Sequence, residues 1–246
     1  MKLKKLIEKT KEINKNKVTR RKSLMRITID LKIFLFALIF VITNQIKFYA
    51  ILMIYAVIHE LGHLVCGLIL KLKPESFNIT PFGLQISFKA DLDLYNTKVK
   101  NGTKLCLKRM ILAIAGPLTN FLIVFILIAL NHAGINANSI LLGETAIYAN
   151  ILIGIFNLIP IYPLDGGRIL KEIINIRSGM KKSYYYINKI SNVTMICLMF
   201  ISSILLLYIH NIAILIILAY LGYLVIKQNR IYKIKSKLIN AIVSLH

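Results

Sequence analysis

Five consecutive residues, His59-Glu60-Leu61-Gly62-His63, combine two imidazoles and a carboxylate in the pattern HExxH. If this segment is helical, positions i and i+4 share one face, so His59 and His63 can bind a single ion. Zinc takes nitrogen ligands of this kind in tetrahedral sites. Glu60 would lie beside the ion, where it can take a proton from water. The pentad therefore predicts a metal centre with a general base next to it.

The pentad lies inside the apolar run 48–70, which is long enough to cross a lipid bilayer. Ionisable side chains are costly in hydrocarbon, so their presence there indicates function more strongly than the same motif in water. One alternative is that His59 and His63 are ordinary polar residues that line a helix interface or a transport path. A third ligand would decide between these interpretations, because catalytic zinc generally has three protein ligands.

Asp165 is the candidate third ligand. It follows the segment Asn157-Leu158-Ile159-Pro160-Ile161-Tyr162-Pro163-Leu164 and precedes two glycines, at the end of an apolar run. Prolines and glycines interrupt a helix, and irregular backbone at membrane depth is tolerated where it faces protein or a wet cavity. The segment is therefore predicted to leave the helix and turn inward, toward the pentad.

Two further residues could ligate a metal by chemistry alone, but their positions argue against it. Glu144 precedes Asp165 by 21 residues in the same run, which is about 31 Å at helical rise. We interpret it as a helix-packing or gate residue. Cys66 lies one turn beyond His63 and is more simply a structural thiol. The odd number and wide spacing of the cysteines, which are Cys66, Cys106 and Cys197, predict no disulfide framework.

Hydrophobic residues make up 57% of the 246-residue chain, which is far above the content of a soluble domain. We predict an all-α polytopic membrane protein with about six transmembrane helices, because most of the apolar runs approach the ~20 residues that a spanning helix needs. The signal is weakest in the first and last runs. The six runs are 31–46, 48–70, 110–131, 139–160, 190–209 and 211–226.

The basic residues predict the orientation of the chain. Of the 32 lysines and arginines, 30 lie in four segments: the tail through residue 26, the loops 71–109 and 168–189, and the tail after residue 226. Retained cytoplasmic loops collect such residues. We therefore predict a basic cytosolic tail over 1–30, a six-span domain over 31–226 and a short basic cytosolic tail over 227–246.

The formal net charge of +22 is interpreted as attraction to anionic membrane lipid. Nucleic-acid binders combine their basic patches with soluble folds or exposed aromatic residues, so no direct nucleic-acid partner is predicted.

A short β-hairpin is predicted between the second and third spans. Apolar residues alternate with polar ones on both sides of a Pro-Phe-Gly turn at 81–83, and they are Phe77, Ile79, Leu84, Ile86 and Phe88. Taken alone, this is most simply a surface hairpin. Its edge strand could also hold a peptide in extended form beside the metal.

Together these segments resemble the site-2 protease family of intramembrane zinc metalloproteases. The family signatures are HExxH on one span and NxxPxxPLDG on a later one, and both are complete here, at 59–63 and 157–166. A third segment, 115–120, is similar to the family's AGPxxN stretch, although Asn120 could equally be an interhelical hydrogen-bonding residue. The resemblance covers roughly residues 48–170 and implies a three-helix catalytic core with a membrane-associated hairpin.

Carried over onto this chain, the resemblance implies one Zn²⁺ per chain, held by His59, His63 and Asp165, with Glu60 as the general base. Asn157 matches the family asparagine that steadies the substrate carbonyl or the oxyanion. The alternative for Asn157 is a helix-packing amide.

The lack of a PDZ insert separates this chain from the envelope-stress branch, and the compact form resembles the stage IV sporulation protein FB group. That resemblance implies a multi-pass cell-membrane or forespore-membrane endopeptidase with both termini cytoplasmic. It would cleave a membrane-associated or transmembrane protein from the cytosolic side, with a pro-sigma factor as substrate and membrane-bound inhibitory regulators. We expect no CBS domain, because the carboxyl-terminal tail is too short to hold one.

A metal transporter or a non-proteolytic metal-binding scaffold is the alternative function. A transporter would need further ionisable residues along a path across the bilayer, and the predicted external half offers only Glu144.

Overall fold

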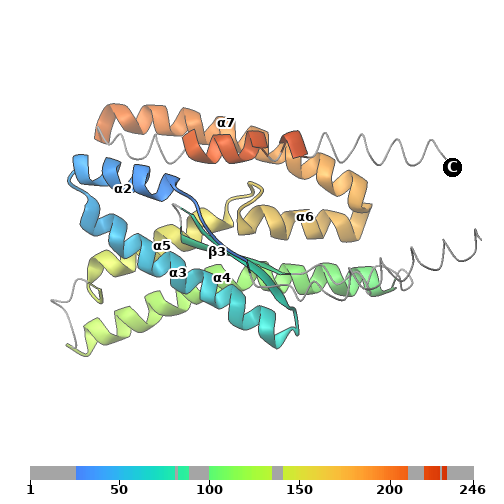
Figure 1. Cartoon of the computed structure of the whole chain (residues 1–246), viewed down its shortest axis with the longest axis horizontal. Coiled ribbons are helices and arrows are strands. Elements are labelled where there is room, and N and C mark those ends of the chain that lie inside the picture. The colour runs from blue at the N-terminus through green and yellow to red at the C-terminus, as the bar shows by residue number, and fades with distance from the viewer. Residues whose placement is uncertain are drawn as a thin grey trace, which may run out of the picture.

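The structure is a computed structural model that describes residues 26–80, 83–88, 100–134, 141–209, 219–227 and 229–231. The helices are α2 (Lys32–Ile42), α3 (Ile46–Ile69), α4 (Lys100–His132), α5 (Glu144–Leu158), α6 (Asp165–Ser178) and α7 (Met180–Ile209). The strands are β1 (Arg26–Ile29), β2 (Pro74–Thr80) and β3 (Gly83–Phe88). The mostly helical architecture with one small sheet confirms the predicted fold class (Figure 1).

Three helical segments are long and apolar enough to cross a membrane: Ile46–Ile69, Gly102–His132 and Lys182–Ile204. They correspond to the second, third and fifth predicted spans. Helices α2 and α5 have only 11 and 15 residues, or about 17 and 23 Å at helical rise, which is less than a typical span. Half of the last predicted run lies outside the described residues. The number of six spans therefore stays a prediction.

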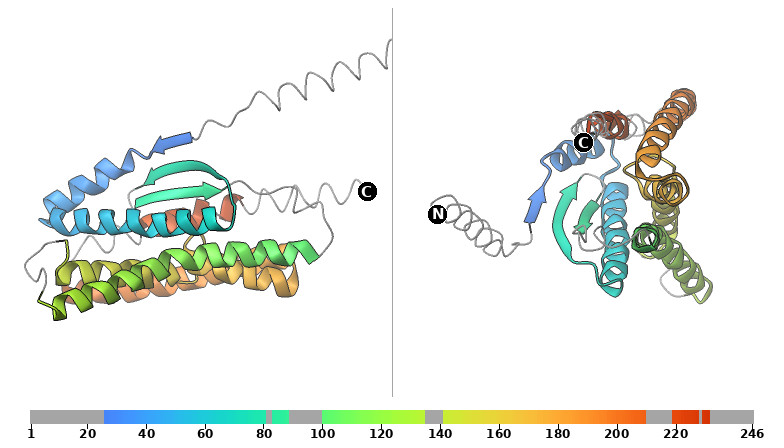
Figure 2. Two further views of the ribbon diagram at one scale, coloured as in Figure 1. Left: turned by 90° about the horizontal axis from the view of Figure 1, so that it is seen from below. Right: turned by 90° about the vertical axis from the view of Figure 1, so that its right-hand side faces the viewer.

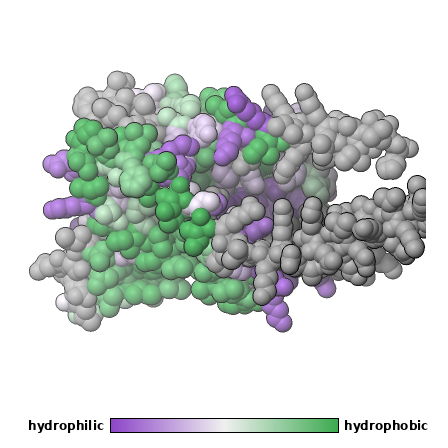
Figure 3. Space-filling model, viewed as in Figure 1, coloured by the Kyte–Doolittle hydropathy of each residue, from purple (hydrophilic) through white to green (hydrophobic). Residues whose placement is uncertain are grey.

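The surface of the helices suits lipid rather than water. Figure 3 shows a broad band of hydrophobic side chains over α2, α3 and α4, with hydrophilic side chains toward its edges. Large apolar side chains are exposed on several helices, among them Phe34, Val65, Phe125 and Phe200. Because soluble proteins rarely expose contiguous apolar area on this scale, these features identify a membrane protein.

The predicted hairpin is present. Strands β2 and β3 pair antiparallel, with Phe77 opposite Ile86 and Ile79 opposite Leu84. Sequence analysis did not anticipate β1, which pairs parallel to β2 and places Ile27 beside Phe77. Its four residues are too few for an alternating pattern to stand out. The sheet order is β1-β2-β3, so β3 is an edge strand.

Helix α3 lies at the centre of the described fold. Both views of Figure 2 show the hairpin on one side of α3 and α4 on the other. Ile51 and Tyr55 of α3 pack in one buried cluster with Leu127 of α4 and with Ala149 and Ile153 of α5. These three helices form the scaffold that carries the pentad at residues 59–63.

The helix break predicted before Asp165 is also present. Helix α5 ends at Leu158, residues 159–164 are not helical, and α6 begins at Asp165. The break is held from α7, because the Tyr162 N–H donates to Ser191 Oγ at 2.9 Å and Ile161 is fully buried against Met195. The chain therefore changes direction just before Asp165, and this turn directs the Asp165 carboxylate toward α3.

Candidate metal centre

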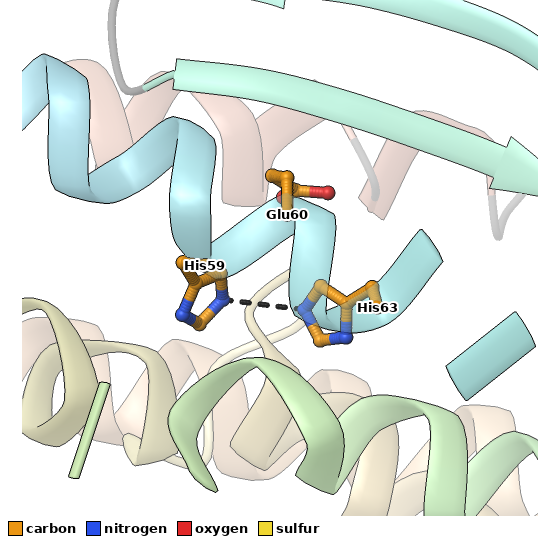
Figure 4. A group of neighbouring side chains, drawn as sticks. All are labelled: His59, Glu60 and His63. Atoms are coloured by element: carbon orange, nitrogen blue, oxygen red, sulfur yellow. Dashed lines mark hydrogen bonds between the residues drawn. The ribbon is translucent and has the colours of Figure 1, made fainter. Parts of the chain in front are cut away.

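Three side-chain atoms from α3 and α6 converge on one point. Nε2 of His59 lies 3.0 Å from Oδ2 of Asp165, Nε2 of His63 lies 3.1 Å from the same oxygen, and the two nitrogens are 3.2 Å apart. Each of the three residues is only 3% exposed. Figure 4 shows the two imidazoles facing each other from successive turns of α3. We call these three atoms the donor triangle.

The outer nitrogen of each imidazole is held by a hydrogen-bond acceptor. Nδ1 of His63 lies 2.7 Å from the carbonyl oxygen of Leu112, and Nδ1 of His59 lies 2.5 Å from Oδ1 of Asn120. A carbonyl oxygen can only accept, so Nδ1 of His63 carries the proton, and Nε2 of the neutral ring carries a lone pair. Outer hydrogen bonds of this kind orient metal-ligating histidines.

The donor triangle fits zinc. Tetrahedral ligands with Zn–N bonds of ~2.0–2.1 Å lie roughly 3.3 Å from one another, close to the separations found here. Lone pairs aimed at one buried point repel unless a cation lies between them. Gly116 of α4 also leaves this place open, because a Cβ atom there would lie 2.4 Å from Nε2 of His63 and 2.5 Å from Nε2 of His59.

Glu60 lies beside the donor triangle. Its carboxylate is within 4.8 Å of the two histidine nitrogens. Figure 4 shows the side chain directed away from the histidine pair. There, Oε2 accepts a hydrogen bond from the backbone N–H of Ile86 in β3 at 3.3 Å. Asp165 is the closer carboxylate to both imidazoles, and Glu60 lies outside the donor triangle.

The other residues considered from the sequence lie outside the triangle. Asn157 is half-buried, and its amide donates to the Ile153 carbonyl at 3.1 Å, so its catalytic role stays a prediction. Glu144 is exposed at the first turn of α5. The Cys66 thiol donates to the Ile111 carbonyl at 3.9 Å, which agrees with a structural role.

Sequence reasoning missed two residues near the centre. Arg168 places Nη1 at 3.4 Å from Oδ1 of Asp165, the oxygen that does not enter the triangle. Asn150 accepts a hydrogen bond from Asn120. The i,i+3 spacing from Asp165 could have indicated Arg168, whereas an amide within an apolar span was the only signal for Asn150.

Buried polar contacts fasten α6, and therefore Asp165, to α4. Glu172 is 3.4 Å from Lys171 Nζ and 3.8 Å from Nη1 of Arg109, and Asn175 donates to the sulfur of Cys106. Burial opposes the charge on Lys171, but nearby tyrosines and Glu172 outweigh it, so the pKa of Lys171 is raised above its usual value. Lys171 therefore stays charged at neutral pH.

Residues 132–202 match the model of Peptidase family M50. This part of the chain is similar to that peptidase family. The matched segment contains the run from Asn157 to Asp165, and the pentad lies before it. A zinc ion would suit the donor triangle, and the group of His59, Glu60 and His63 could also hold a metal ion.

The chain is similar to a zinc metalloprotease of Methanocaldococcus jannaschii, with 34% identity over 147 residues, or 58% of this chain. It spans only 40% of that protein's length. It also shares the fold of a solved site-2 protease from the same organism, with a TM-score of 0.62 and 22% identity, covering 83% of this chain and 92% of the other. The resemblance to site-2 proteases is thus confirmed at the level of the fold, without specifying the sporulation group.

Gly116→Ala should abolish metal binding. The added methyl group would occupy the space in front of both Nε2 atoms, so the zinc affinity should fall by at least the roughly 10–100-fold that loss of an outer-shell partner costs. Competition with a chromogenic chelator measures this affinity.

Gly102→Ala is the matched control on the same helix, because a Cβ there meets nothing within 4 Å. It should retain the zinc affinity of the original chain. Melting temperatures recorded with excess chelator compare the metal-free proteins. If Gly116→Ala melts at the same temperature as the original chain, its loss of zinc affinity reflects a blocked site and not misfolding. Undiminished zinc binding by Gly116→Ala would contradict the assigned position of the ion.

Proposed function

We propose that this protein is a zinc metalloendopeptidase of the site-2 protease type, which cleaves a membrane-associated or transmembrane protein. The observation that carries the proposal is the donor triangle of His59, His63 and Asp165, buried between helices whose outer surfaces suit lipid. The M50 segment and the name of the M. jannaschii relative support it.

One Zn²⁺ per chain would be held by the three atoms of the donor triangle. Bound zinc supplies Lewis acidity, which favours loss of a proton from water and makes a carbonyl more electrophilic. The protein contributes the dry surroundings of the site and the fixed positions of its three ligands, so electrostatic effects are stronger there than in water.

Glu60 is assigned the proton transfers. Its carboxylate lies next to the triangle without belonging to it, so it can take a proton from the attacking water and return one to the leaving amine. Asn157 is proposed to donate its amide to the oxyanion that forms on the substrate. Its place at the end of α5, just before the helix break, supports this role.

Strand β3 is proposed to hold the substrate in extended form. A transmembrane substrate helix hides its carbonyl groups in its own hydrogen bonds, so it must unwind before water can attack. The Ile86 N–H points to Glu60 rather than to β2, and therefore lies on the open edge of the sheet. A substrate strand added at this edge would run past both Glu60 and the metal.

The orientation of the chain and its biological context are further proposals. The concentration of basic residues in four segments supports cytoplasmic termini and access from the cytosolic side. The resemblance to the sporulation group supports a pro-sigma factor as the substrate, a forespore-membrane location and inhibitory membrane partners. The catalytic core would extend over about 48–170.

Glu60→Gln should keep zinc and lose proteolysis. The amide cannot accept the proton from water, and general base catalysis contributes about 10²–10⁴-fold to such reactions. Cleavage of a co-expressed pro-sigma factor, followed by product size on a gel, gives the activity, and metal analysis of the purified protein gives the zinc content.

Glu75→Gln makes the same chemical change at an exposed residue of β2 and should cleave normally. Cleavage by Glu60→Gln at the rate of this control would refute the assigned base.

Ile86→Pro should reduce cleavage more than Ile86→Ala does. Both substitutions remove the buried side chain, but only proline removes the outward N–H, which donates to Glu60 here and would have to turn to a substrate carbonyl. Proline is tolerated where that N–H faces away from the neighbouring strand. Zinc content should be unchanged in both variants. Equal activity of the two would show that substrate does not pair with β3 at this position.

A further inference from the structure

A chain of hydrogen bonds runs from the donor triangle into the protein, away from the metal. Nδ1 of His59 lies 2.5 Å from Oδ1 of Asn120, Nδ2 of Asn120 donates to Oδ1 of Asn150 at 2.9 Å, and Nδ2 of Asn150 donates to the carbonyl of Ala146 at 2.8 Å. Both asparagines are fully buried. We call this series the asparagine relay, and it links α3, α4 and α5.

The last acceptor fixes the direction of every bond in the relay. The Ala146 carbonyl can only accept, so the amide nitrogen of Asn150 must face it. The oxygen of Asn150 then faces Asn120, which must turn its own nitrogen toward that oxygen. This leaves Oδ1 of Asn120 facing His59, so the proton of the neutral imidazole is held on Nδ1, and Nε2 keeps its lone pair for a ligand.

We propose that Asn150 is a positioning residue for the metal centre, and that it acts on His59 through Asn120. The proposal rests on the ligand set given under the proposed function. It assigns a role in metal binding to a residue that touches neither the metal ligands nor the substrate strand.

His59 needs the relay more than His63 does. The partner of His63 is the main-chain carbonyl of Leu112. A carbonyl oxygen can only accept a hydrogen bond, so it always keeps the proton of His63 on Nδ1. The partner of His59 is a side-chain amide, which presents an acceptor on one side and donors on the other. Without Asn150, Asn120 could turn its nitrogen toward Nδ1, and the imidazole proton would then lie on Nε2, in the way of the metal.

Zinc affinity of the purified full-length chain in detergent tests this role. We expect Asn150→Leu and the smaller Asn150→Ala to bind zinc about 10-fold more weakly or worse, within the range found for outer-shell partners. Asn120→Asp presents oxygens on both sides and cannot turn a donor toward His59. The double variant Asn120→Asp/Asn150→Leu should therefore bind zinc within about 2-fold of Asn120→Asp alone.

This dependence on residue 120 separates positioning from packing. Unchanged zinc affinity in both Asn150 single variants would overturn the proposal. It would also be overturned if Asn150→Leu lowered the zinc affinity equally in the original chain and in the Asn120→Asp variant. His59→Ala tests the ligand set itself and should abolish stoichiometric zinc binding. If His59→Ala keeps its zinc, the ligand assignment fails, whatever the Asn150 variants do.

Discussion

The structure depends on one electrostatic constraint: two imidazole nitrogens and a carboxylate oxygen, aimed at a single buried point, are stabilised by a cation between them. Helix α3 supplies both nitrogens at i and i+4. The break between α5 and α6 brings in the oxygen of Asp165, and Gly116 keeps the opposing face of α4 free of side-chain atoms. Zinc coordination would therefore join α3 to α6 and contribute to folding as well as to catalysis.

The polar groups around the donor triangle are hydrogen-bonded, because an unpaired polar atom buried in an apolar helix bundle destabilises the fold. The outer nitrogen of His63 is satisfied by the main chain and that of His59 by the asparagine relay, while α6 is fixed to α4 through Glu172 and Asn175. Because Glu60 is bonded to β3 and not to His59, His63 or Asp165, helix α3 carries both the two imidazoles of the donor triangle and a carboxylate outside it.

Much of the site was predictable because its determinants are local. The i,i+4 spacing places His59 and His63 on one face, and the prolines and glycines around Asp165 end a helix in any context. The alternation that predicts the β2–β3 hairpin is also local. Other features depend on tertiary contacts. Strand β1 is only four residues long and needs β2 beside it, and α2 and α5 stop earlier than their apolar runs. The role of Asn150 can be recognised only from its hydrogen bond with Asn120 at 2.9 Å.

Zinc K-edge X-ray absorption of the purified protein in detergent tests the central claim most directly. A tetrahedral site built on His59, His63 and Asp165 predicts one zinc per chain, surrounded only by nitrogen and oxygen at ~2.0–2.1 Å, with the multiple scattering that imidazole rings produce. A sulfur neighbour at ~2.3 Å would instead indicate a cysteine ligand such as Cys66 and would contradict the account.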